Sequence, residues 1–193
     1  MRIIAGLGNP GREYRLTRHN VGWMALDALA ERCRAGPEEA RCDGVAVRTR
    51  RLVLFKPLRM MNLSGPPAAQ LLRAEGVSVE DLLVLVDDVN LPLGTVRIRA
   101  GGSDGGHNGL ASLVEALATE QFARLRLGIG PCPVGTVLRD YVLSPFEEDE
   151  EPAVEHMVAR AVEAARCWDR RGMQAAMERF NRRDDQWPAP DGQ

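Results

Sequence analysis

The chain of 193 residues has few cysteines, few histidines and a single lysine. Its cysteines, Cys33, Cys42, Cys132 and Cys167, lie far apart and form no C-x-x-C pair, and there are only three histidines. These residues offer neither the spacing of a metal site nor a disulfide framework. We therefore expect reduced thiols, as in cytosolic proteins, and no zinc.

Long apolar runs are absent as well. The longest fall well short of the roughly 20 residues that a membrane-spanning helix needs. The first two residues lead at once into an apolar strand, so no secretory leader is expected. The sequence thus predicts a cytoplasmic protein without a membrane partner.

The formal net charge of −2 argues against a protein that binds nucleic acid over its whole surface. The charge is nevertheless uneven, with six carboxylates in residues 147–155 and a group of arginines in residues 160–183. Acidic residues in the first turns of a helix and arginines in its last turns are both stabilised by the helix dipole. One long C-terminal helix therefore accounts for both clusters without a functional role.

Apolar residues make up 45% of the chain, which is enough for the core of one globular domain. Residues 82–86 are apolar on both faces, which is typical of a central strand in a parallel or mixed sheet. A capping-box pattern with proline at the first helical position predicts that the last helix begins at Ser144. We expect one domain over residues 1–185 and a loose tail at 186–193. The other predicted strands cover 2–7, 44–56 (a hairpin), 95–100 and 124–129, and the other helices 21–34, 62–75, 110–118 and 137–143.

The stretch 6–22 follows the first predicted strand and carries Asn9 in a Gly/Pro turn and then His19. Histidine has an unperturbed pKa of about 6.5, so it can be a neutral base at cellular pH. The end of a buried strand is also where open α/β sheets usually hold their chemistry. On this stretch alone, a plain helix-capping role for His19 and Asn20 is an equal alternative.

Two glycine-rich stretches suggest further possible functions. Residues 6–11 fit the G-x-G-x-x-G fingerprint of dinucleotide-binding proteins, but Pro10 stiffens the turn and no helix opens at Gly11. A dinucleotide-dependent oxidoreductase is therefore a remote alternative. Residues 101–109, five of them glycine, are typical either of a phosphate cradle or of a flexible connection.

Six polar residues lie just beyond predicted core elements or in glycine-rich turns: Asn9, His19, Asn62, Asp87, His107 and Asn108. No serine lies in a sharp strand-to-helix nucleophile elbow and no cysteine has a nucleophile setting, so covalent catalysis is unsupported. A neutral histidine, one carboxylate and three amides instead suit water-mediated hydrolysis. The histidine would take a proton from water, the aspartate would stabilise the imidazolium, and the amides would bind the oxyanion.

Five separated motifs resemble, in order and spacing, those of the bacterial peptidyl-tRNA hydrolase family. They are G-L-G-N-P-G-x-x-Y-x-x-T-R-H-N-x-G (6–22), M-N-L-S-G (61–65), D-D-x-N-L-P-x-G (87–94), G-G-S-x-G-G-H-N-G-L (101–110) and R-L-x-x-G-I-G (124–130). The resemblance extends over residues 3–183. It implies a monomeric esterase, without metal or cofactor, that frees tRNA from peptides dropped by stalled ribosomes. The implied fold is a single α/β domain with a mixed β-sheet flanked by helices, and the implied partner is peptidyl-tRNA.

At the motif positions that match the family, the resemblance implies that His19 is the proton acceptor that activates water. It also implies that Asp87 holds His19 in its basic form. Asn9 would distinguish a blocked peptidyl group from a free aminoacyl group. The remaining implied substrate contacts are Asn62, His107 and Asn108 near the ester and Tyr14 and Met60 at the tRNA 3′ end, with Met60 in place of the family's usual aromatic residue. Arg97, Arg99 and Arg126 match basic positions that resemble a clamp for the tRNA 5′ phosphate.

A non-catalytic RNA-binding relative of the same family is the main alternative. The presence of Asn9, His19, Asp87 and Asn108 counts against it. In either case a protein of net charge −2 would bind tRNA through a local arginine patch, and such binding is sensitive to salt.

Overall fold

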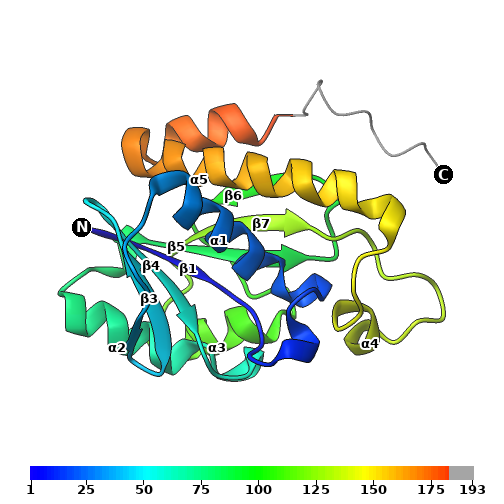
Figure 1. The fold of residues 1–193 in the computed structure, drawn as a ribbon, viewed down its shortest axis with the longest axis horizontal. Coiled ribbons are helices and arrows are strands. Elements are labelled where there is room, and N and C mark those ends of the chain that lie inside the picture. Colours follow the sequence, from blue (N-terminus) through cyan, green and yellow to red (C-terminus); the bar gives the residue numbers. More distant parts are fainter. Residues whose placement is uncertain (183–193) are drawn as a thin grey trace.

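One sheet with the strand order β2-β3-β4-β1-β5-β7-β6 forms the centre of the computed structural model, which describes residues 1–182 (Figure 1). Strands β1, β4, β5 and β7 run parallel, whereas β2, β3 and β6 form antiparallel pairs. The mixed sheet implied by the resemblance is therefore confirmed. The strands are β1 (Arg2–Gly6), β2 (Glu39–Arg41), β3 (Gly44–Arg48), β4 (Leu52–Pro57), β5 (Leu82–Asp88), β6 (Val96–Arg99) and β7 (Ala123–Gly128).

Helices cover both faces of this sheet, with α1 and α5 on one side and α2 and α3 on the other (Figure 1). Successive strand residues point to opposite faces, so Ile4 joins the core under α1 and α5 while Ile3 joins the core under α2 and α3. The α-helices are α1 (Val21–Cys33), α2 (Gly65–Glu75), α3 (Asn108–Leu117), α4 (Leu138–Val142) and α5 (Glu151–Phe180). Short 3-10 helices are η1 (Arg12–Tyr14), η2 (Arg18–Asn20), η3 (Met61–Leu63), η4 (Val79–Asp81) and η5 (Glu148–Glu150).

Strand β5 is buried along its whole length and lies between β1 and β7. The prediction of a central strand from its continuous apolar run is thus confirmed. Because β1, β4, β5 and β7 are parallel, their carboxyl ends lie at one edge of the sheet, and Asp87 and Asp88 end β5 at that edge. This edge is the usual position of a binding site in an open α/β sheet.

The predicted start of the last helix is wrong. The Ser144 hydroxyl donates to the backbone oxygen of Tyr141 at 2.8 Å, so it closes α4 instead of capping the next helix. The capping box forms between Glu147 and Glu150, where the Glu147 N–H donates to Oε2 of Glu150 at 2.8 Å. Helix α5 begins only at Glu151.

Helix α5 is also not continuous, contrary to the prediction of one long helix. Gly172 interrupts it with φ 83° and ψ 178°, a conformation that glycine adopts without the clash a Cβ would cause. Arg2 caps the end of the first section, since its Nη1 donates to the backbone oxygens of Trp168 and Asp169 at 2.6 and 2.9 Å. Strand β2 was not predicted either, because its three residues carry no clear pattern.

The glycines after β1 serve close packing. A Cβ on Gly6 would lie 2.6 Å from the backbone oxygen of Gly22, and one on Gly8 would lie 2.7 Å from the Trp23 ring. The next α-helix begins at Val21 and not at Gly11, so the helix that the dinucleotide fingerprint requires at this turn is missing. The oxidoreductase alternative therefore has no support.

The predicted domain end at residue 185 and the predicted tail at 186–193 lie outside the described residues. Within residues 1–182, no helix combines the length and the apolar character needed to cross a membrane.

Candidate active site

A cavity of about 870 Å³ opens at the carboxyl edge of the parallel strands. Its volume lies in the range of small-molecule sites, roughly 300–1,000 Å³. Of the predicted site residues, Arg97 does not line it. Those that do are Asn9, Tyr14, His19, Met60, Asn62, Asp87, Arg99, His107, Asn108 and Arg126.

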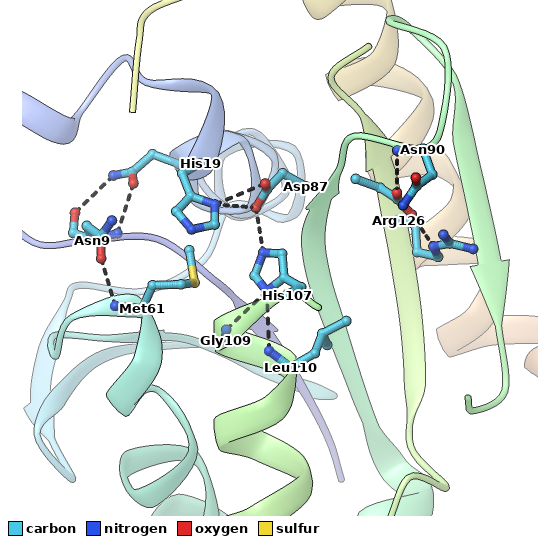
Figure 2. A network of polar contacts seen from close by, with 11 residues as sticks. Asn9, His19, Met61, Asp87, Asn90, His107, Gly109, Leu110 and Arg126 are labelled. Atoms are coloured by element: carbon cyan, nitrogen blue, oxygen red, sulfur yellow. Dashed lines mark hydrogen bonds and ion pairs between the residues drawn. The ribbon is translucent and has the colours of Figure 1, made fainter. Parts of the chain in front are cut away.

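His19 and Asp87 form a buried pair at the wall of this cavity (Figure 2). Nδ1 of His19 lies 2.9 Å from each carboxylate oxygen of Asp87. An ionised carboxylate only accepts hydrogen bonds, so Nδ1 carries the proton and Nε2 keeps its lone pair. Among residues 1–182, none hydrogen-bonds to that Nε2. Since neither His19 nor Asn20 caps α1 with its side chain, the capping alternative is wrong.

His107 makes a second hydrogen bond to the same carboxylate. Its Nε2 donates to Oδ1 of Asp87 at 2.9 Å, and its ring lies 5.0 Å from that of His19 (Figure 2). Its Nδ1 accepts from the backbone N–H groups of Gly109 and Leu110 at 3.1 and 3.3 Å, which caps α3. Because both ring nitrogens are engaged, His107 has no free lone pair for a base.

The two histidines determine the charge state of Asp87. Burial by itself raises the pKa of this carboxyl, but its electrostatic interactions with His107 and His19 and the hydrogen bonds that both rings donate to it lower the pKa by more. The net effect is an Asp87 pKa well below the ordinary value for aspartate. The Asp87 carboxylate is therefore ionised at neutral pH.

The ligand atoms of His19, Asp87 and His107 lie within 4.8 Å of one another, a spacing that would also suit a metal ion. A metal-bound histidine, however, donates the N–H of its other ring nitrogen. In His107 that other nitrogen, Nδ1, accepts two backbone N–H groups. The tautomer of His107 therefore does not fit a metal at Nε2.

The side chain of Asn9 is held in one orientation. Its Oδ1 accepts from the backbone N–H of Met61 at 2.7 Å, which leaves its amide N–H₂ as the group it can offer to a ligand (Figure 2). Asn20 holds the backbone of Asn9 from the other side: Oδ1 of Asn20 accepts from the Asn9 N–H at 2.8 Å, and its Nδ2 donates to the Asn9 oxygen at 3.0 Å. Asn20 was not among the predicted site residues, although it follows His19 directly.

Arginines from β6 and β7 share one face of the sheet. Arg97 lies opposite Arg126 and Arg99 opposite Arg124, and residues directly opposite each other point to the same side. Arg97 and Arg99 are exposed, while Arg126 forms an ion pair with Asp88 (Figure 2). Arg97 therefore extends this basic face beyond the cavity.

Arg124 was not predicted as a site residue, yet it lines the cavity and is buried. Its Nη1 donates to the backbone oxygen of Ser103 at 2.7 Å, and its Nη2 donates to that of Glu120 at 3.0 Å. It thereby anchors the glycine-rich stretch 101–106, which also lines the cavity. The alternation R-L-R was the available sequence signal, since it placed Arg124 on the same side as Arg126.

Comparison with known proteins gives one consistent result. The family model described as peptidyl-tRNA hydrolase matches residues 3–187. The chain is 44% identical to the peptidyl-tRNA hydrolase of Methylacidiphilum infernorum over 180 residues, covering 93% of this chain and 97% of that one. It is 43% identical to that of Bacillus cereus over 185 residues, covering 94% and 100%. The crystal structure of peptidyl-tRNA hydrolase from Acinetobacter baumannii superposes with a TM-score of 0.88 at 28% identity, covering 94% of each chain. The chain therefore belongs to the peptidyl-tRNA hydrolase family.

Proposed function

We propose that this protein hydrolyses the ester between the peptide and the 3′ ribose of peptidyl-tRNA. The observation that carries the proposal is the His19–Asp87 contact, which leaves the lone pair of Nε2 free at the wall of the cavity. The names of the relatives support the same substrate. In this proposal the products are a free peptide and a tRNA that can be charged again.

In the proposed mechanism His19 acts as the general base. Its Nε2 takes a proton from water while the water oxygen attacks the ester carbonyl, and Asp87 stabilises the imidazolium that forms. The tetrahedral intermediate then collapses, the bond to the ribose oxygen breaks, and the imidazolium returns its proton to that oxygen. The amides of Asn62 and Asn108, both exposed at the cavity, donate hydrogen bonds near the developing oxyanion.

Asn9 provides the proposed selection for a blocked amino group. Since Met61 occupies its Oδ1, the side chain offers only N–H groups to the substrate. A peptide carbonyl accepts such a group, whereas the ammonium of a free aminoacyl-tRNA is itself a donor and would find no acceptor there. The buried N–H₂ therefore favours peptidyl-tRNA over aminoacyl-tRNA.

The tRNA 3′ end is proposed to lie against Tyr14 and Met60. Both residues line the cavity, and the Met60 side chain is exposed. A thioether adapts to a nucleobase by soft packing where an aromatic ring would stack. We further propose that the protein acts as a cytoplasmic monomer without metal, the last point supported by the tautomer of His107.

Parallel assays of N-acetyl-aminoacyl-tRNA and free aminoacyl-tRNA test the proposal. We expect tRNA release from the blocked substrate and a rate lower by at least about 100-fold from the free one, because a site built for a hydrogen bond strongly rejects a ligand that cannot make it. Tight binding of the blocked substrate without any release would instead identify a non-catalytic RNA-binding relative.

Replacing both Arg97 and Arg99 by alanine is expected to raise KM while leaving kcat nearly unchanged. The proposed clamp neutralises the tRNA 5′ phosphate, and one such contact contributes roughly one unit to the slope of log affinity against log salt. Measuring kcat/KM across a salt series should therefore give a slope smaller by about one unit.

The matched control for this pair is Arg50→Ala with Arg73→Ala. Both arginines are exposed, neither lines the cavity, and the change in net charge is the same. This control should keep the original KM and salt slope. If the two double variants show the same slope, the clamp lies elsewhere.

A further inference from the structure

Arg18, the residue before His19, is buried without lining the cavity. Its Nη1 and Nη2 donate to Oε1 and Oε2 of Glu150 at 3.0 and 2.6 Å, and its side chain is 4% exposed. Its Cζ also lies 4.5 Å from the ring centre of Tyr141 and 4.9 Å from that of Phe146. A two-pronged contact between guanidinium and carboxylate, combined with aromatic rings, defines the position of an arginine closely.

The backbone around Arg18 is attached to the same region. The Arg18 N–H donates to the Ser144 oxygen at 2.9 Å, and Thr17 forms an isolated β-bridge with Pro145. Glu150 in turn accepts from the Glu147 N–H as part of the capping box before α5. Helix η2 is thus joined to the segment 141–150, which leads from α4 into α5.

His19 needs such an attachment because the element that carries it is short. Helix η2 has three residues and no side-chain cap, and 3-10 turns have weaker hydrogen-bond geometry than α-helices. The contact between Nδ1 and Asp87 orients the imidazole ring, but it does not hold the η2 backbone. An error of about 1 Å in the position of a reacting group can cost about 100-fold in rate.

We infer that the Arg18–Glu150 ion pair is a positioning device for His19. It holds the η2 backbone against the start of α5, so that Nε2 of His19 stays at the wall of the cavity. Arg18 and Glu150 are positioning residues here, since neither lines the cavity. The kinetic consequence rests on the proposed function, whereas the structural consequence for the His19 ring does not.

A purely stabilising role is the competing explanation, and the chain contains a matched control for it. Arg48 donates to the two carboxylate oxygens of Glu75 at 3.0 and 2.8 Å, in the same two-pronged geometry. The Glu75 side chain is 5% exposed, against 22% for Glu150. This second pair joins β3 to α2, and neither residue lines the cavity. A loss of stability alone should therefore affect both pairs.

The experiment compares Glu150→Gln with Glu75→Gln. For each variant we would measure kcat and KM on N-acetyl-aminoacyl-tRNA and the melting temperature. We would also record the NMR signals of the two ring N–H groups that hydrogen-bond to Asp87, which are His19 Nδ1–H and His107 Nε2–H. In Glu150→Gln we expect kcat to fall by about 10–100-fold with KM within about twofold of the parent. The His19 Nδ1–H signal should shift or broaden, while the His107 Nε2–H signal should stay in place.

Glu75→Gln should lower the melting temperature but leave kcat, KM and both ring signals unchanged. A folded Glu150→Gln protein with the parent kcat and an unshifted His19 signal would overturn the inference, as would equal losses of kcat in the two variants. If Glu150→Gln does not fold, Arg18→Lys, which keeps the charge but loses the two-pronged contact, serves for the same measurements. If the parent protein itself releases no tRNA, the proposed function is contradicted. A shifted His19 signal in Glu150→Gln would still support the inference in that case.

Discussion

Replacing His19 by asparagine is expected to lower kcat on N-acetyl-aminoacyl-tRNA by about 10²–10⁴-fold, the usual contribution of a general base. The Asn side chain can still donate to Asp87, as Nδ1 of His19 does at 2.9 Å, so the fold should persist. What disappears is the basic nitrogen at the cavity wall. Because the substrate contacts remain, KM should change far less than kcat.

Steady-state kinetics together with thermal unfolding would check this expectation. His156→Asn is the matched control, since His156 lies on α5 and does not line the cavity. It should keep the parent kcat. The expected loss of kcat is about 10²–10⁴-fold. A His19→Asn protein that retains about a tenth or more of the parent kcat would therefore rule out His19 as the base.

Asp87→Asn is expected to lower kcat by up to about 10⁴-fold, the effect that the same change has in enzymes with a catalytic histidine–carboxylate pair. The carboxylate accepts from both His19 and His107, whereas an amide has one oxygen and a donor group. The amide N–H₂ would favour the His19 tautomer with the proton on Nε2. That tautomer presents a donor to the cavity in place of a base.

The same variant should reveal the lowered pKa of Asp87 through the dependence of stability on pH. A carboxyl whose pKa is lower in the folded state stabilises the fold above its unfolded pKa of about 3.9, and this stabilisation is lost as the pH falls through the folded pKa. The melting temperature of Asp87→Asn should therefore lie below that of the parent at pH 5, and the gap should narrow as the pH falls below about 4. A gap that stays constant down to pH 3 would contradict the lowered pKa of Asp87.

Much of the fold could be predicted from local patterns. The apolar run in β5 is long enough to identify a strand covered on both faces, and proline in the first turn and glycine at the C-cap mark the two ends of α2. The start of α5 was predicted wrongly because the same pattern permits two caps. The Ser144 hydroxyl donates to the Tyr141 oxygen at the end of α4, so it does not cap α5. The break at Gly172 was also missed, since one glycine does not by itself show where a helix turns away.

The site residues could be predicted as types and approximate places but not as a network. The apolar strands and the turns after them indicated Asn9, His19, Asp87 and Asn108 as candidates for one hydrolytic site, and these residues all line the cavity. The sequence did not indicate that His107 shares the Asp87 carboxylate. Nor did it indicate that Arg97 lies outside the cavity. Alternation along a strand shows which face of the sheet a side chain is on, but it does not show how far a cavity extends along that face.

The sequence by itself determined the family, the central strand and the identity of a histidine, a carboxylate and the amides that end up together. The tertiary structure alone decided which atoms of these groups stay free. Asn9 is oriented by a backbone N–H 52 residues away, and Arg18 is paired with a carboxylate 132 residues away. Such partners depend on how distant segments pack, and hydrogen bonds with strict distance and angle requirements then select one orientation. Patterns of neighbouring residues carry no information about that selection.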